Sequence, residues 1–229
     1  MAKVKFSALI SEMRNKLNGS VFARNRGGAY LRTKVTPSNP QSIAQVLVRA
    51  RLAAYAQAWR SLTEEQRTAW SAAVGSWQTT DVFGDLLNPT GNTLYTRLNI
   101  NIAIADGAAL VLPPTPVGVA SMTALSVVGD DSANTVIVTA TPSDVPANTA
   151  MVIEATPQMS PGISNANSKF RQVEVFAPAA AGPFDISASY QAKFGTLVTG
   201  QKLFVRVKYI NQLTGERSQP LNAYSIVVA

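Results

Sequence analysis

The sequence contains no cysteine and no histidine among its 229 residues. Disulfide scaffolds, thiolate or imidazole metal sites, cysteine nucleophiles and serine–histidine triads are therefore excluded. Without disulfides, the folded chain depends on packing for its stability. We expect no catalytic residues, no metal ligands and no cofactor, and hence a protein that is not an enzyme.

Charged residues are also scarce, and long apolar runs are missing. Charged residues make up 14% of the chain, against roughly 25% in typical soluble domains, whereas hydrophobic residues make up 46%. No apolar run reaches the ~18 residues that a membrane span needs, and the N-terminus lacks the apolar core of a signal peptide. We expect no membrane association, and a chain used inside a cell or released by lysis.

The positive charge is concentrated at the N-terminus. Residues 1–34 hold eight basic residues against one acid, Glu12, which accounts for the whole formal net charge of +7. Residues 35–108 and residues 109–229 are each balanced. The segment 1–34 is therefore expected to meet something acidic, either nucleic acid or an acidic protein surface.

A proline-rich break at residues 112–116 separates a helix-like composition from a Thr/Val/Ser-rich one. It predicts an α+β protein of two domains, residues 1–112 and 113–229. The first would hold a β-hairpin and helices, and the second an antiparallel β-sandwich.

Residues 19–35 have the pattern of a β-hairpin with a turn at residues 25–28. Alternation places Tyr30, Arg32 and Lys34 on one face, which is therefore basic and aromatic. A partner-binding surface is expected from the basic and aromatic residues concentrated here: Phe22, Arg24, Arg26, Tyr30, Arg32 and Lys34. Arginine suits carboxylate and phosphate alike, so three interpretations stay open: a solvated face, an acidic protein partner, or nucleic acid.

Helices are predicted over residues 41–61, 63–74 and 92–105. The first would be capped by Asn39 with Pro40 at its first position, and the second begins with a capping box, Thr63 to Gln66. The first two are expected to form a helical hairpin. The third also alternates as a strand would, but we favour helix.

The apolar residues of the helical part suggest how it packs. Residues 75–89 are expected to be a loop whose Trp77 and Phe83 cover the helix ends, and Trp59 and Trp70 are expected in the core. The first helix carries a stripe of mostly small residues that should pack closely: Ile43, Val46, Leu47, Ala50, Ala53, Ala54 and Ala58.

From residue 121 onward the apolar period becomes two, which is typical of strands. Seven short strands separated by turn residues predict a sandwich of the immunoglobulin or fibronectin type III kind. Their expected ranges are residues 121–128, 133–140, 149–155, 169–177, 185–190, 202–210 and 219–228. Asp130 and Asp131 fall between two strands, where turn chemistry explains them better than calcium binding.

One segment is distinctive, GSVFARNRGGAYLRTKVTPSNPQ at residues 19–41. It is followed by Ala58, Trp59, Leu62, Thr63, Gln66, Arg67 and Trp70. Over about residues 15–75 the chain resembles small virion-associated proteins of tailed bacteriophages, particularly those infecting Bacteroidetes, including the crAss-like group. The C-terminal half resembles fibronectin type III or immunoglobulin-like domains, which phage capsid and tail proteins often carry.

This resemblance implies a non-enzymatic structural protein of a phage virion, assembled in the cytoplasm of the bacterial host. A capsid decoration or head-fibre protein is favoured, with the basic N-terminal region as anchor and the sandwich projecting outward. Its partners would be capsid, portal or neck proteins and further copies of itself. A collar or tail component, or a packaged-DNA-binding protein, are the alternatives.

Overall fold

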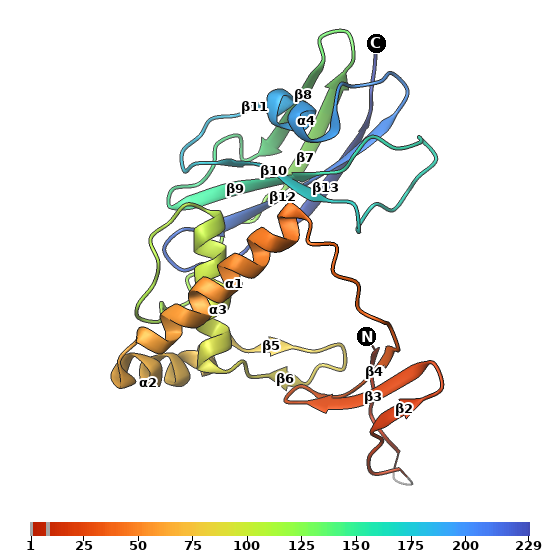
Figure 1. Ribbon diagram of the computed structural model, residues 1–229. Helices are drawn as coiled ribbons and strands as arrows, with labels where there is room; N and C mark the ends of the chain where they lie inside the picture. The colour runs from red at the N-terminus through yellow and green to blue at the C-terminus, as the bar shows by residue number, and fades with distance from the viewer. Residues whose placement is uncertain (1, 8–9) are drawn as a thin grey trace.

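The structure, a computed structural model, describes residues 2–7 and 10–229. It combines helices with several antiparallel sheets, an α+β mixture. Figure 1 shows a small N-terminal sheet at one end, helices in the middle and a β-sandwich at the other end. Residues 1, 8 and 9 of the expected basic arm lie outside the described residues. In the described part of the chain, no helix is both long and apolar enough to cross a membrane.

A four-stranded antiparallel sheet opens the chain, in the order β1-β4-β3-β2. Its strands are β1 (Ala2–Lys3), β2 (Asn15–Leu17), β3 (Ser20–Asn25) and β4 (Gly28–Thr33). The hairpin expected over residues 19–35 is confirmed as β3 and β4. Strands β1 and β2, which precede the hairpin in the chain, flank it on either side. Residues 34–42 then run without regular structure to the first helix (Figure 1).

The three predicted helices are confirmed as α1 (Ile43–Ser61), α2 (Glu64–Ala73) and α3 (Gly91–Ile104). The capping box of α2 is present, with the Gln66 backbone N–H donating to Thr63 Oγ1 at 3.3 Å. The expected start of α1 is wrong, because the helix begins after Ser42. The Asn39 side chain does not cap it, and instead its Oδ1 accepts from Arg49 Nη1 at 2.7 Å.

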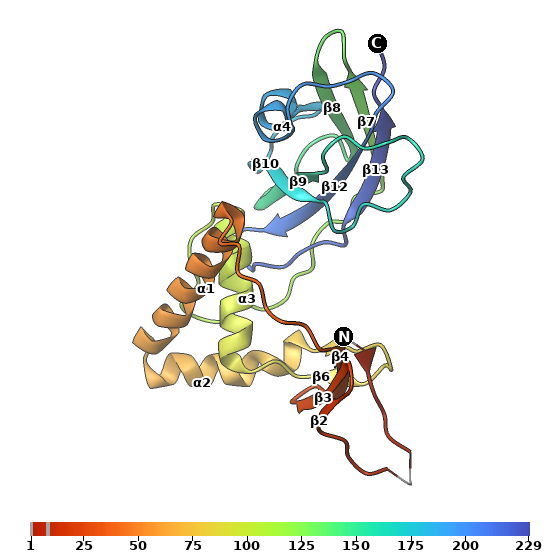
Figure 2. The same cartoon turned by 45° about the vertical axis from the view of Figure 1, so that its right-hand side comes forward.

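The helical core forms around Tyr95 of α3. Its ring lies 5.3 Å from that of Trp70 and 5.4 Å from that of Trp59, between ring centroids. Both α1 and α2 pack on α3 rather than along each other, so the expected helical hairpin of α1 and α2 is wrong (Figure 2). The expected core placement of Trp59 and Trp70 is confirmed: Trp70 is fully buried, and part-buried Trp59 packs on the cluster.

Residues 75–89 are more ordered than a loop. They hold the end of a 3-10 helix, η1 (Val74–Trp77), and a short hairpin of β5 (Thr79–Thr80) and β6 (Leu86–Leu87). Trp77 is buried in the helical core as expected. Phe83, at the tip of the hairpin, does not cover a helix end as expected. Its ring lies beneath Lys5 of the N-terminal region.

The apolar stripe of α1 faces solvent, contrary to expectation. Of the seven stripe residues, only Ala58 is part-buried; the other six are exposed. Tyr55 and Trp59, on the opposite side, contact Tyr95 of α3 instead. The helix therefore has two apolar faces, and its aromatic face is the one that packs inside the molecule.

The C-terminal half is a β-sandwich. One sheet has the order β10-β9-β12-β13 and the other β11-β8-β7, and residues of both line one buried cluster. The strands are β7 (Ala124–Asp130), β8 (Thr135–Thr141), β9 (Thr149–Ala155), β10 (Arg171–Phe176), β11 (Phe184–Asp185), β12 (Lys202–Asn211) and β13 (Leu221–Ile226). Six of the seven expected strands are confirmed.

The strand expected over residues 185–190 is wrong. Only Phe184 and Asp185 pair as β11, and the chain then enters the helix α4 (Ser187–Phe194). Asp185 Oδ1 accepts from the Ser187 backbone N–H at 2.9 Å, which stabilises the helix start. Tyr190 of α4 is fully buried in the sandwich core, so tertiary packing decides in favour of helix.

The end of α3 packs on the outer face of the larger sheet. Ala105 forms a small buried cluster with Ala150, Val152 and Ile210. Strand β9 is therefore covered on both faces, which explains why six of its seven residues are buried. Asn101 Nδ2 of α3 donates to the Gly215 carbonyl at 2.6 Å, which adds a buried hydrogen bond to this junction.

Candidate functional site

The β3–β4 hairpin is built around a two-residue turn. Asn25 pairs with Gly28, so Arg26 and Gly27 form the tip. Asn25 Oδ1 accepts from the Gly27 backbone N–H at 2.9 Å, and Gly28 has a φ of +101°, which favours glycine. Local turn chemistry therefore fixes where the two strands pair.

The pairing register distributes the expected partner-binding residues over both faces of the sheet. Phe22 pairs with Leu31 and Arg24 with Ala29, whereas Val21 pairs with Arg32 and Ala23 with Tyr30. Paired residues share a face and neighbours alternate. Phe22 and Arg24 therefore lie on the face opposite Tyr30 and Arg32. Arg26 occupies the turn and Lys34 follows the end of β4.

The six residues therefore do not form one continuous basic and aromatic surface. Alternation along the sequence correctly assigns the residues of β4 to its two faces. The pairing register between β3 and β4 decides which residues of β3 share each of these faces. Arg24, Arg26, Arg32 and Lys34 are exposed, while Phe22 and Tyr30 are part-buried.

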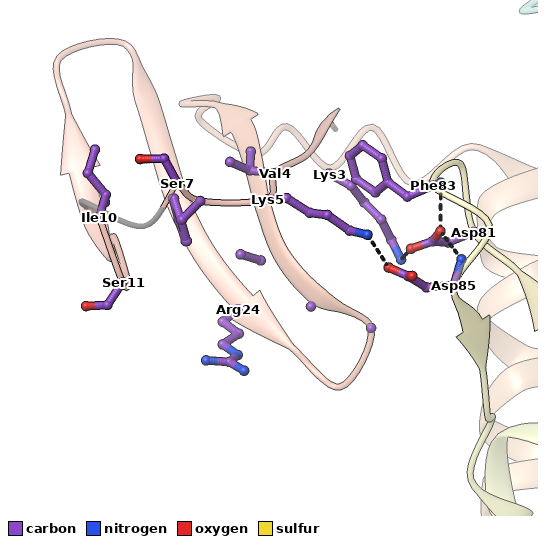
Figure 3. Close-up of a pocket in the computed structure, with 14 residues that line it drawn as sticks. Lys3, Val4, Lys5, Ser7, Ile10, Ser11, Arg24, Asp81, Phe83 and Asp85 are labelled. Carbon is purple, nitrogen blue, oxygen red and sulfur yellow. Dashed lines mark hydrogen bonds and ion pairs between the residues drawn. The ribbon is translucent and has the colours of Figure 1, made fainter.

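Half of the eight basic residues in the segment 1–34 already have acidic partners. Figure 3 shows Lys3 and Lys5 reaching across a pocket of about 620 Å³ to Asp81 and Asp85 of the β5–β6 hairpin. The Nζ–Oδ2 distances are 2.7 Å for Lys3–Asp81 and 3.0 Å for Lys5–Asp85. These acids lie far from both lysines along the chain and were not identified as partners from the sequence.

Asp81 is the best-connected of these acids. Its Oδ1 accepts from the backbone N–H groups of Phe83 and Asp85, at 2.7 and 3.0 Å. The Lys3 hydrogen bond, followed by these backbone bonds, lowers the pKa of Asp81 below its ordinary value. The pocket's charges thus hold the N-terminal sheet against the β5–β6 hairpin.

Glu12 neutralises a second pair of cations. Its Oε1 lies 2.8 Å from Arg14 Nη2 and 3.6 Å from Arg24 Nη1. The Arg14 hydrogen bond is the main cause that lowers the pKa of Glu12. Of the eight basic residues of this region, the four that pair with no acid among the described residues are Lys16, Arg26, Arg32 and Lys34.

The N-terminal sheet has no core of its own. None of the described residues between 2 and 34 is buried. A short-stranded sheet normally needs a packed face to be stable, and here only one end is held, by the β5–β6 hairpin. The sheet thus presents part-buried apolar residues and four unpaired cations on surfaces that nothing in the described chain covers.

A second pocket, of about 360 Å³, lies at the junction of helices and sandwich and includes Arg97, Glu216 and Arg217. Glu216 accepts from the backbone N–H groups of Val117 and Gly118, at 3.1 and 3.2 Å. Burial lowers the pKa of both arginines. Through its two backbone hydrogen bonds, the Glu216 carboxylate attaches the segment that connects α3 to β7 to the rest of the sandwich.

Asp130 ends β7 and Asp131 begins the turn that follows, so both acids take part in turn chemistry, as the sequence indicated. Asp130 Oδ1 accepts from the Ala133 backbone N–H at 3.0 Å, and Asp131 Oδ2 accepts from Thr199 Oγ1 at 2.6 Å. Among the described residues, no group of three acidic side chains is placed to hold a metal ion.

Comparison with known proteins finds a single kind of likeness. No protein-family model matches the chain, and no curated protein matches it. A solved structure described as "The crystal structure of a Fn3-like protein from Clostridium thermocellum" is similar over 48% of this chain and 94% of that chain. Its sequence identity is 16% and its TM-score 0.30. The sandwich assignment stands on the strand pairing described above.

Proposed function

We propose that this protein is a non-enzymatic structural component of a tailed-phage virion. Its residues 1–112 would form an anchoring domain and its residues 113–229 a projecting domain of the fibronectin type III or immunoglobulin kind. A capsid decoration or head-fibre protein is the favoured role.

The observation that carries this proposal is an N-terminal sheet without a buried side chain among its described residues. A sheet that is regular yet uncovered gains stability when a partner covers it. The four unpaired cations, among them exposed Arg26 and Arg32, select an acidic surface. The phage setting is supported by the resemblance of residues 15–75 to virion-associated proteins.

The interaction would combine charge with apolar contact. Arg32 and Arg26 would pair with carboxylates of the acidic partner, while part-buried Tyr30 and Val21, on the same face as Arg32, would lose their remaining solvent exposure. Because an exposed ion pair contributes only ~0–1 kcal/mol, specificity would depend on several pairs acting together.

The test is incorporation into particles. A phage that carries the gene would be grown with the wild-type chain, with Arg32→Glu, or with Lys169→Glu, and gradient-purified particles would be analysed by quantitative mass spectrometry. Lys169 is an exposed sandwich residue, so its reversal is a matched control. We expect Arg32→Glu to reduce incorporation about tenfold, corresponding to ~1.4 kcal/mol, and the control to have no effect. Absence of the wild-type chain from particles would refute the proposal.

Packaged DNA as the partner is distinguished by a titration of the full chain with duplex DNA across salt concentrations. If the four unpaired cations of the N-terminal sheet are the ones that contact phosphates, the slope of log K against log salt is about −3.6. Binding that persists at physiological salt and is lost in Arg32→Glu would assign the sheet to the genome rather than to a protein lattice.

A further inference from the structure

The outer face of α1 is an exposed apolar surface. Ile43 is 90% exposed, and Val46 and Leu47 are each 50% exposed. Ala50, Ala53 and Ala54 continue the same face at helical spacing and are also exposed. In both views no other element lies over the side of α1 turned away from α3 (Figures 1 and 2).

The aromatic contacts of α1 with α3 come from its other side, from Tyr55 onward; nearer the N-terminus, Val48 and Leu52 on that side are 62% and 51% exposed. Tyr55 and Trp59 pack against Tyr95, with ring centroids 6.4 and 5.4 Å apart. Scattered apolar residues are common on protein surfaces, but a continuous apolar strip marks an interaction site.

The strip is complementary to itself. Its large residues, Ile43, Val46 and Leu47, lie in the N-terminal part, and its alanines follow from Ala50 onward. If a second copy packs antiparallel about a two-fold axis near Ala50, Val46 and Leu47 of each helix face Ala54 and Ala53 of the other. An isologous contact of this kind closes after two copies, and alanines allow close helix packing.

The charges beside the strip indicate an apolar rather than an ionic contact. Helix α1 contains three arginines and no acid. Arg49 is held back by its hydrogen bond to Asn39, at 2.7 Å, and so is directed toward the preceding segment. A second copy of α1 brings cations of the same sign, so salt should strengthen the contact by screening their repulsion.

We propose that the outer face of α1 binds a second copy of this chain, antiparallel and two-fold symmetric. The strip from residue 43 to residue 54 is only ~17 Å long at 1.5 Å per residue. It therefore buries less than the ~800 Å² per partner of a stable interface. The isolated dimer is therefore weak, and an assembly that concentrates the copies strengthens it.

Sedimentation velocity on the full chain tests this between about 1 and 500 µM, at low and high salt. We expect a monomer–dimer equilibrium that shifts toward dimer as salt rises, and Leu47→Glu to weaken it at least tenfold. Val82→Glu is the matched control, because Val82 is an 84% exposed apolar residue on the β5–β6 loop. A monomer at every concentration overturns the proposal, as does association that Leu47→Glu leaves unchanged.

Crosslinking provides a second test that does not depend on a weak equilibrium. Because the chain has no cysteine, Ala50→Cys introduces a single thiol at the proposed two-fold axis. We expect it to form an intermolecular disulfide at least tenfold faster than Ala72→Cys, placed at an exposed alanine of α2. Equal rates would overturn the arrangement. The crosslinking rates do not depend on particle incorporation. The dimer proposal can therefore fail while the proposed virion role holds, and the virion role can fail while the dimer holds.

Discussion

Replacing Gly215 with alanine should weaken the junction between α3 and the sandwich. Gly215 lies in the loop between β12 and β13 with a φ of +73°, where an L-residue costs ~1–2 kcal/mol. An added Cβ would also lie 2.6 Å from the Leu98 carbonyl oxygen. That oxygen belongs to the backbone of α3, so it cannot rotate away, and overpacking of this kind costs about 1–3 kcal/mol.

The expected loss for Gly215→Ala is therefore about 2–5 kcal/mol in the free energy of unfolding. Gly200→Ala separates the two causes, because Gly200 has a similar φ of +80° but an added Cβ would meet no atom within 4 Å. Its loss should be only ~1–2 kcal/mol. Urea unfolding followed by circular dichroism measures both values. If the two variants lose equal stability, within about 0.5 kcal/mol, the steric argument at Leu98 is refuted.

Two further predictions concern the capping box and acid sensitivity. Thr63→Ala removes the capping box of α2 and should cost ~1 kcal/mol in urea unfolding, whereas Thr68→Ala in the exposed middle of that helix should cost nothing; equal effects would contradict the capping role. The pKa of Asp81 is lowered in the folded chain, so its ion pair with Lys3 stabilises the attachment of the N-terminal sheet. This stabilisation is fully present at pH values above the ordinary pKa of 3.8, and it is lost as the pH falls through the lowered pKa of the folded chain. The protection of the β1 amides against hydrogen exchange, taken relative to the intrinsic rate at each pH, should therefore fall on acidification in the wild type and be already low at neutral pH in Asp81→Asn; equal protection in both would contradict it.

Local patterns in the sequence were sufficient for most of the secondary structure. The capping box at Thr63, the turn at residues 25–28 and the alternation of β8 depend on neighbours along the chain. These interactions act over a few residues, so they can be inferred without knowing the fold. The helix α4 shows the limit, because the burial of Tyr190 overrides a strand-like alternation.

The candidate surfaces depended on information that is not local. Sequence alternation identified the basic hairpin, but the β3–β4 register separated Phe22 and Arg24 from Tyr30 and Arg32. The acids that neutralise Lys3 and Lys5 belong to a different hairpin, far along the chain. Electrostatic partners at such a separation are set only when the β5–β6 hairpin folds beside the sheet.

The sequence by itself determined that the chain lacks cysteine and histidine chemistry, concentrates its positive charge in residues 1–34 and combines helices with a β-sandwich. Only the tertiary structure decided which face of α1 is buried. Helical period shows that both faces are apolar, but the aromatic contacts of Tyr55 and Trp59 with Tyr95 select one for the core. The physical reason is that burial is a property of what packs against a face, and that partner is fixed by the whole fold.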